Sequence, residues 1–297
     1  MAPSSKIPGL RSRLRVVGVI PARYDSERLP GKVLLPICGK PMLQIVYERA
    51  RLCSLLDELW VATDSEKVQA CCVQNRIPVL MTLRTHRSGT ERILEVMQKT
   101  PSEVYGSGVR VNVLYVNVLY VNIQGDEPMI TPDHLRLLIE PFFNATASNS
   151  ATGDSTAGNP TAGTPDGTHP GVQVTTLKTP LDPAEASNPN VVKVVTNLRG
   201  EAVYFSRAPI PYPRNPAAGL GFYKHLGLYA YTRGALEQYR TLPVSPLEET
   251  ERLEQLRFLD HGIPIHVAET AQDTIGVDTE EDLAAVTRYF EALPPAG

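Results

Sequence analysis

The chain has 297 residues, 42% of them hydrophobic and 21% charged, which is typical of a globular protein and enough for a full α/β core. Its formal net charge of −3 gives no support for the broad basic surface of a nucleic-acid-binding protein, and no run reaches the roughly 18 apolar residues of a membrane span. Four cysteines follow no metal-ligand spacing and predict free thiols in a reducing compartment: Cys38, Cys53, Cys71 and Cys72.

The amino-terminal segment is basic, with four cations and no acid among residues 1–15, and it lacks the apolar core of a signal peptide. We interpret residues 1–14 as a disordered tail ahead of one domain that spans 15–293. A cytoplasmic protein is expected, and an organelle protein is the alternative if the tail is a short targeting segment.

An apolar run at residues 16–20 predicts a buried parallel strand, because it shows no polar alternation. A loop rich in proline, glycine and cations follows, from Pro21 to Lys32. At the carboxyl end of a sheet strand such a loop suits a triphosphate, since its backbone N–H groups wrap the anion while Arg23, Arg28 and Lys32 neutralise it. A solvated basic loop is the competing interpretation.

The segments after this loop alternate between helix and strand patterns. We expect a helix from Pro41 to Ala50, strands at 59–63 and 78–81, and between them a helix over 65–75 capped by Asp64. This alternation predicts βαβ units and a mostly parallel sheet flanked by helices.

A third amphipathic helix is predicted after His86. Ser88 or Thr90 would cap it, leaving its free N–H groups and Arg92 near the sheet edge. A plain capped helix without a ligand is the competing interpretation.

Residues 112–121 contain the sequence Asn-Val-Leu-Tyr-Val twice, leading into Gln-Gly-Asp-Glu-Pro at 124–128. Because strands of about five or six residues are typical, both copies together are too long for one strand. Because the repeat length is odd, a shift by one copy would turn every side chain to the opposite face. We predict that the second copy enters the sheet and that the first extends its edge or loops out.

A helix is predicted from Pro132 to about Glu140, followed by a change of composition. Residues 144–171 consist mainly of Ala, Thr, Ser, Gly, Pro and Asn, so they have little to bury against their ordering entropy. We interpret this segment as a disordered insertion within the domain.

The remaining chain again alternates between strand and helix signals. We expect strands at 172–178, 225–231 and 263–268, a hairpin of 191–195 with 202–205, an exposed arm at 209–221, a helix from Ser245 through Arg257, and a closing helix to about Leu293.

Two carboxylates each follow a predicted strand and stand in a glycine-containing turn, Asp126 and Asp278. If both strands end at one sheet edge, the two side chains can share Mg²⁺, which binds one or two carboxylates together with substrate phosphates. Taken singly, Asp126 reads as a turn residue and Asp278 as a helix cap.

Eight short blocks resemble the 3-deoxy-manno-octulosonate cytidylyltransferase (CMP-Kdo synthetase) family. They are Ile-Pro-Ala-Arg at 20–23, Pro-Gly-Lys at 30–32, Ser-Gly-Thr-Glu-Arg at 88–92, Gln-Gly-Asp-Glu-Pro at 124–128, Tyr-Phe-Ser-Arg at 204–207, His-Leu-Gly at 225–227, Leu-Glu-Gln-Leu-Arg at 253–257 and Gly-Val-Asp-Thr at 276–279. They occur in the family's order and cover roughly residues 15–290 apart from the insertion.

The resemblance implies a Rossmann-like nucleotidyltransferase fold with a β-rich dimerisation arm, and a Mg²⁺-dependent homodimer. It also implies the reaction of CTP with 3-deoxy-D-manno-octulosonate (Kdo) to give CMP-Kdo and pyrophosphate, by in-line attack of the anomeric hydroxyl on the α-phosphate.

By the same resemblance the catalytic residues are Arg23, Lys32, Asp126 and Asp278, of which Asp126 and Asp278 would bind the metal. The nucleotide would contact Pro21, Ala22, Arg23, Arg28, Lys32, Ser88, Gly89, Thr90 and Arg92. Kdo would contact Gln124, Arg207, His225, Tyr229, Glu254 and Gln255, with Arg207 facing its carboxylate. His225 also fits a structural hydrogen bonder, and Glu254 or Gln255 a solvated helix residue.

Three other functions compete with this one. Another sugar-acid cytidylyltransferase, such as CMP-sialate synthetase, would share the phosphate half of the site. A nucleotide-binding scaffold without turnover is disfavoured by the intact Arg23, Lys32, Asp126 and Asp278. A dinucleotide dehydrogenase is disfavoured because Pro-Ala-Arg, not a glycine fingerprint, follows the first strand.

Overall fold

The computed structural model describes residues 14–26, 28–86, 88–100, 118–147, 171–215 and 221–293. Its strands are β1 (Arg15–Pro21), β2 (Pro36–Ile37), β3 (Lys40–Pro41), β4 (Glu58–Thr63), β5 (Val79–Met81), β6 (Val118–Asn122), β7 (Val174–Leu181), β8 (Lys193–Thr196), β9 (Ala202–Ser206), β10 (Phe222–Thr232) and β11 (Ile265–Glu269). Its α-helices are α1 (Met42–Ala50), α2 (Glu66–Gln74), α3 (Gly89–Lys99), α4 (Pro132–Ala147), α5 (Arg233–Thr241), α6 (Pro246–Glu251), α7 (Gln255–Asp260) and α8 (Glu280–Glu291).

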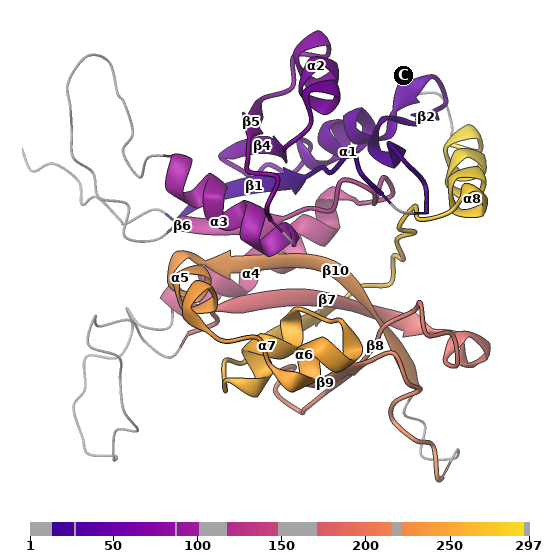
Figure 1. Ribbon diagram of the computed structural model, residues 1–297. Helices are drawn as coiled ribbons and strands as arrows, with labels where there is room; N and C mark the ends of the chain where they lie inside the picture. Colours follow the sequence, from indigo (N-terminus) through magenta and orange to yellow (C-terminus); the bar gives the residue numbers. More distant parts are fainter. Residues whose placement is uncertain are drawn as a thin grey trace, which may run out of the picture.

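One central sheet runs through the described part of the chain in the order β11-β7-β10-β6-β1-β4-β5, with β8 paired to β10 and β9 paired to β8 (Figure 1). β1 pairs in parallel with β4 and β6, β4 with β5, and β11 with β7. β10 runs antiparallel to both β6 and β7. The prediction of a mixed, mostly parallel sheet flanked by helices is confirmed.

Both faces of the sheet are covered by helices, which is why residues 16–20 of β1 are apolar. Val16 and Ile20 pack on one face with α1, α2 and α4, whereas Val17 and Val19 pack on the other with α3, α5 and α7. A strand buried on both faces shows no polar alternation, as the sequence indicated.

The pairing of β6 with β1 shows where the second repeat copy lies. Val118 to Val121 enter the sheet, with Tyr120 opposite Val17 of β1, as predicted. Leu119 and Val121 face the α1 side, and Val118 and Tyr120 face the α3 side. The first copy lies outside the described residues, as do residues 1–13 and 148–170.

Several element predictions need correction. α4 continues through Pro141 to Ala147, so it takes in the first residues of the predicted insertion. Ser65, not Asp64, is the N-cap of α2, and the helix expected from Ser245 through Arg257 is two helices, α6 and α7. They separate because Arg252 adopts a left-handed conformation with φ 52°.

The hairpin of β8 and β9 and the capped closing helix α8 form as predicted, while α5 was missed. None of the described helices is both long and apolar enough to cross a bilayer.

Because β1, β5 and β6 run in parallel, the loops after them gather at one sheet edge, where the antiparallel β10 begins. Chain segments far apart in the sequence therefore meet there. In open α/β sheets this carboxyl edge is the usual place for a ligand.

Candidate active site

A cavity of about 600 Å³ opens at this sheet edge. Among its lining residues are nine that the sequence assigned to a site: Arg28, Gly89, Thr90, Gln124, His225, Tyr229, Glu254, Gln255 and Asp278. Asn122, Glu127, Asn188, Asn190, Lys224 and Asp282 also line it and were not predicted.

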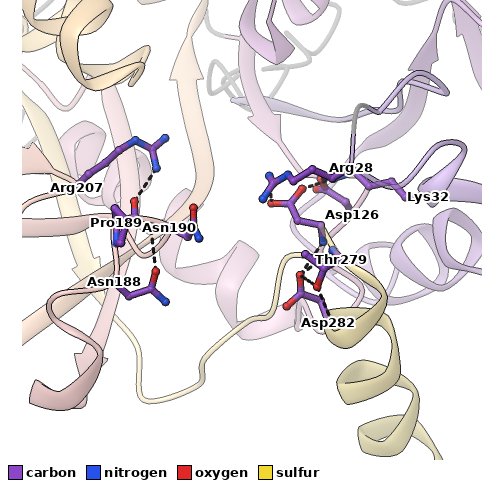
Figure 2. Close-up of polar contacts among 10 residues, drawn as sticks. Arg28, Lys32, Asp126, Asn188, Pro189, Asn190, Arg207, Thr279 and Asp282 are labelled. Atoms are coloured by element: carbon purple, nitrogen blue, oxygen red, sulfur yellow. Dashed lines mark hydrogen bonds and ion pairs between the residues drawn. The ribbon is translucent and has the colours of Figure 1, made fainter.

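Three of the predicted catalytic side chains, Lys32, Asp126 and Asp278, meet beside the cavity (Figure 2), and Asp278 is the one of the three that lines it. The Lys32 Nζ lies 2.5 Å from Asp126 Oδ2 and 2.8 Å from Asp278 Oδ1, so one ammonium bridges two carboxylates. Gly31, with φ 70°, turns the loop sharply just before Lys32. The N–H of Val277 donates to the carbonyl of Asp126 at 2.9 Å, which ties the two aspartate loops together.

The charges of this cluster balance one another. Burial alone lowers the pKa of Lys32, but Asp126 and Asp278 outweigh it and raise that pKa above its ordinary value. The Arg28 Nη2 pairs with Asp278 Oδ2 at 2.7 Å from the more exposed side. Two carboxylates therefore face two cations. A charged ligand can replace some of these ion pairs, with its anionic groups on the cations or its cation on the carboxylates.

Asp278 is aimed by the start of α8. Thr279 caps this helix, and Asp282 Oδ2 accepts from the backbone N–H groups of Asp278 at 3.0 Å and Thr279 at 2.9 Å. The sequence indicated Asp278 as a helix cap, but that task belongs to Thr279. The Asp278 carboxylate is thereby left to the cavity.

Gly125 lets the loop of Asp126 approach the β1 loop closely. A Cβ at position 125 would lie 2.8 Å from the Pro21 carbonyl oxygen, which is a backbone atom with little room to move. We expect Gly125→Ala to destabilise the fold by about 1–3 kcal/mol and to lower turnover by displacing Asp126. Urea unfolding and steady-state kinetics measure this, and wild-type values for both would contradict the close approach.

Arg23 lies beside the amino-terminal end of α3. Its Nη2 donates to the carbonyl of His86 at 2.6 Å. The neighbouring Ala22 is buried, and its N–H donates to the carbonyl of Ala62 at 2.9 Å, so this N–H holds the backbone and is not available for a nucleotide.

The start of α3 has the predicted cap, but one of the residues predicted to contact the nucleotide, Arg92, does not line the cavity. Ser88 Oγ accepts from the N–H of Glu91, whereas Gly89 and Thr90 line the cavity. The Arg92 side chain is fully buried, bonds to Thr82 and lies 3.4 Å from Asp64. The Arg92 guanidinium points into the protein here, and its contact with the nucleotide stays a prediction.

The cavity is also lined by five of the six residues predicted for the sugar acid, all except Arg207. The Glu254 carboxylate is hydrogen-bonded to Thr90 and Ser88, which links α7 to the start of α3, and burial raises the pKa of Glu254. Gln124 donates to the carbonyl of Gly227 at 2.9 Å. The buried Gln255 Nε2 and Asn122 Oδ1 have no hydrogen-bond partner within the described chain, and both residues line the cavity.

His225 is buried, with its Nε2 3.0 Å from Thr176 Oγ1, and its ring lies 5.4 Å from that of Tyr229. Burial lowers the pKa of His225 to about 3, so the imidazole is neutral at physiological pH. A neutral ring can exchange hydrogen bonds with hydroxyls but supplies no charge to a carboxylate.

We expect the loss of stability in His225→Gln to shrink as the pH falls. An unfolded histidine protonates near pH 6.5, whereas the folded one stays neutral to about pH 3, so the wild type loses stability across this interval and the variant lacks that loss. Urea unfolding at pH 7 and pH 4.5 checks the sign, and a stability gap that widens at pH 4.5 would contradict it.

Arg207 stands at the rim and does not line the cavity. Its Nε donates to the carbonyl of Glu251 and its Nη1 to that of Pro189, both at 2.9 Å. Figure 2 shows Arg207 with Asn188 and Asn190 on the side opposite Lys32 and Asp126.

Two ionisable side chains that were not predicted from the sequence, Glu127 and Lys224, also line the cavity. Glu127 accepts from Thr274 Oγ1 at 3.1 Å, and burial with the neighbouring Asp126 charge raises the pKa of Glu127 to about 7. Lys224 donates to Asp273 Oδ1 at 2.9 Å and to the carbonyl of Thr274 at 2.7 Å. Each adjoins a predicted site residue in the sequence, which is the one signal that pointed to them.

Comparisons with known proteins agree on one family. The family model described as cytidylyltransferase matches residues 17–267. The chain is 47% identical to 3-deoxy-manno-octulosonate cytidylyltransferase from Acidobacterium capsulatum over 279 residues, covering 94% of this chain and 98% of the relative. It is 42% identical to the Escherichia coli protein of the same name over 272 residues, covering 92% and 94%.

Solved structures extend this similarity to three dimensions. The structure of CMP:2-keto-3-deoxy-manno-octonic acid synthetase complexed with CTP matches with a TM-score of 0.77 at 41% identity, covering 93% of this chain and 98% of that one. A cytidylyltransferase from Leptospira borgpetersenii matches with a TM-score of 0.55 at 15% identity, covering 95% and 89%, and shares the fold.

Proposed function

The chain belongs to the 3-deoxy-manno-octulosonate cytidylyltransferase family, and we propose that it converts CTP and Kdo to CMP-Kdo and pyrophosphate. The observation that carries this proposal is the cluster of Lys32, Asp126 and Asp278, which joins the cavity through Asp278. That cluster suits phosphate chemistry, and the rest of the cavity suits a polyhydroxylated acid.

In the proposed complex the triphosphate lies along the loop after β1. Arg23, Arg28 and Lys32 would neutralise it, and the cytidine would lie against Pro21 and the start of α3, where Ser88, Gly89 and Thr90 stand. Arginine and lysine that already have partners lose less side-chain entropy when they bind an anion.

The sugar acid would occupy the wall opposite the cluster. Gln124, His225, Tyr229, Glu254 and Gln255 would exchange hydrogen bonds with its hydroxyls, and the unpartnered Gln255 Nε2 supports this assignment. The neutral His225 leaves recognition of the carboxylate to a cation, and Arg207 at the rim would approach it once the sugar is bound.

The reaction is a displacement at the α-phosphorus. The anomeric oxygen of Kdo forms a bond to the α-phosphorus and gives up its proton, while the bond to the bridging oxygen breaks and pyrophosphate leaves. The chain's residues hold the two reactants in line, and Lys32 with Arg23 stabilises the negative charge on the phosphates.

A Mg²⁺ ion fits the aspartate pair, because both carboxylates already point at one cationic group. Within the described residues no cluster of three or more His, Cys, Asp or Glu side chains would hold a metal alone, which matches a Mg²⁺ that completes its shell with water and substrate phosphates. Asp126 and Asp278 would hold the ion, which when bound polarises the attacking hydroxyl and neutralises the phosphates.

A homodimer is part of the proposal. The β8–β9 hairpin and the arm that follows β9 carry the exposed apolar side chains of Leu198, Val203 and Tyr212, which a dimer interface would cover. We expect the protein to sediment as a dimer and Leu198→Glu with Val203→Glu to sediment as a monomer. A monomeric wild type would contradict the assignment.

Labelled CTP tests the proposed reaction. With Mg²⁺ and Kdo, the label of α-³²P-CTP is expected in a sugar nucleotide and that of γ-³²P-CTP in pyrophosphate. Release of γ-labelled orthophosphate, or no transfer of the α label, would contradict the displacement.

A further inference from the structure

A set of contacts behind the phosphate loop centres on Glu95 of α3. Its Oε2 accepts from the N–H of Leu83 at 2.8 Å and contacts His86 Nε2, while its Oε1 pairs with Lys99 at 2.6 Å. Glu95 is only 8% exposed, so a buried carboxylate forms its hydrogen bonds with a short surface segment.

That segment is the 83–86 loop, which joins β5 to the start of α3. Leu83 is 60% exposed, and residues 84 and 85 are exposed as well, so the loop gains little from packing. Its contacts with Glu95 come at both ends, through the N–H of Leu83 and the ring of His86.

The same loop supplies the partner of Arg23. The His86 carbonyl accepts from Arg23 Nη2 at 2.6 Å, and this is the protein hydrogen bond that aims the guanidinium. Burial lowers the pKa of Arg92, and the nearby charge of Arg23 lowers it further, so the two cations repel each other. A held carbonyl is needed to keep the two cations near each other.

Glu95 is suited to this task because it stays ionised. Burial opposes its charge, but bonds from Lys99, the Leu83 N–H and His86 outweigh burial and lower the pKa of Glu95 to about 2. Hydrogen bonds to a charged acceptor are roughly twice as strong as neutral ones.

We propose that Glu95 is a positioning residue: it fixes the 83–86 loop so that the His86 carbonyl aims Arg23 at the triphosphate of CTP. This inference rests on the proposed function, since it assumes that Arg23 binds phosphate. Glu95 itself does not touch a substrate.

A double-mutant cycle in CTP affinity tests the inference. Calorimetric titration with CTP and with CMP, without the sugar acid, separates phosphate binding from binding of the cytidine. We expect Glu95→Ala to lower CTP affinity about tenfold, or about 1.4 kcal/mol, and to change CMP affinity less than about twofold. Arg23→Met is expected to lose at least as much CTP affinity, and adding Glu95→Ala to it should cost nothing further, because groups that act as a unit are not additive.

Two further variants keep the test decisive. Lys99→Met removes the partner of Glu95 Oε1 but leaves the contacts of Oε2 with Leu83 and His86, so it should cost less CTP affinity than Glu95→Ala does. Glu95→Gln keeps the shape of the side chain and replaces Glu95→Ala in the cycle if the alanine variant does not fold.

The outcomes distinguish the inference from the proposed function. Three outcomes would overturn the positioning role alone. The losses of CTP affinity in Glu95→Ala and Arg23→Met could be additive, or Glu95→Ala could lose as much affinity for CMP as for CTP. The third outcome is unchanged CTP affinity in the Glu95 variants while Arg23→Met binds CTP weakly. Unchanged CTP affinity in Arg23→Met would overturn the phosphate assignment of Arg23 and the inference with it.

Discussion

Replacing Asp126 or Asp278 by asparagine is expected to reduce turnover by at least about 100-fold while the fold survives. Each carboxylate contributes one oxygen to the Lys32 ammonium, and the two together would hold Mg²⁺. Asparagine has nearly the same shape, so the loops that carry positions 126 and 278 can keep their backbone bonds. Stopped assays of pyrophosphate release give the turnover, and circular dichroism reports the fold.

Electron paramagnetic resonance measures the binding of Mn²⁺ in the presence of CTP. It distinguishes a loss of metal binding from a loss in the chemical step. Both variants should bind Mn²⁺ more weakly than the wild type. Asp133→Asn is a matched control, because Asp133 is exposed on α4 and pairs with Arg136 far from the cavity. Full activity in either Asp126→Asn or Asp278→Asn would contradict the metal assignment.

Lys32→Met is expected to lower kcat/KM for CTP by about 100- to 1,000-fold. The substitution removes the cation next to the phosphates and leaves two carboxylates without the ammonium that bridges them. Like charges brought close together repel, so the metal-free variant should also melt at a lower temperature than the wild type.

Mg²⁺ is expected to reverse part of the decrease in melting temperature of Lys32→Met, because the ion can take the place of the ammonium between the carboxylates. Melting in EDTA and in Mg²⁺ measures this directly. Lys40→Met is the matched control, since Lys40 is half-exposed and pairs with Glu48 on the surface. Wild-type kcat/KM in Lys32→Met would contradict the role of Lys32.

The sequence was sufficient for those parts of the site that strand ends determine. Asp126 lies in the turn after β6 and Lys32 ends the loop after β1, so a parallel pairing of β1 with β6 brings both loops to one edge. Asp278 was predicted from its glycine-containing turn after the last strand, and the hydrogen bond from Val277 to Asp126 is the physical link that holds it there.

Side-chain direction within helices was harder to predict. Thr90 and Arg92 stand two residues apart near the start of α3, and at about 100° per residue they point to nearly opposite sides. Thr90 therefore reaches the cavity while Arg92 is buried against Thr82 and Asp64. The sequence suggests that the block Ser-Gly-Thr-Glu-Arg is one nucleotide-binding loop, but its first residues lie at the cavity and its last residue is buried in the protein.

Buried charges were not predictable from pattern at all. Lys193 stands in an apolar strand, and its Nζ donates to the carbonyls of Asn188, Val191 and Arg207 at 2.9, 2.6 and 2.5 Å. These bonds hold the cavity wall and become visible only when a loop and two strand ends meet in space. Glu95 is a similar case, since its partners belong to a loop whose path the sequence does not determine.

The central claim is that the cavity joins CTP to Kdo. The most direct measurement follows pyrophosphate release from CTP and Mg²⁺ with Kdo, with sialic acid, or with no acceptor. Rapid release with Kdo alone is the predicted result. Release with sialic acid alone would contradict the substrate assignment, and CTP binding without release under any condition would instead support a nucleotide-binding scaffold.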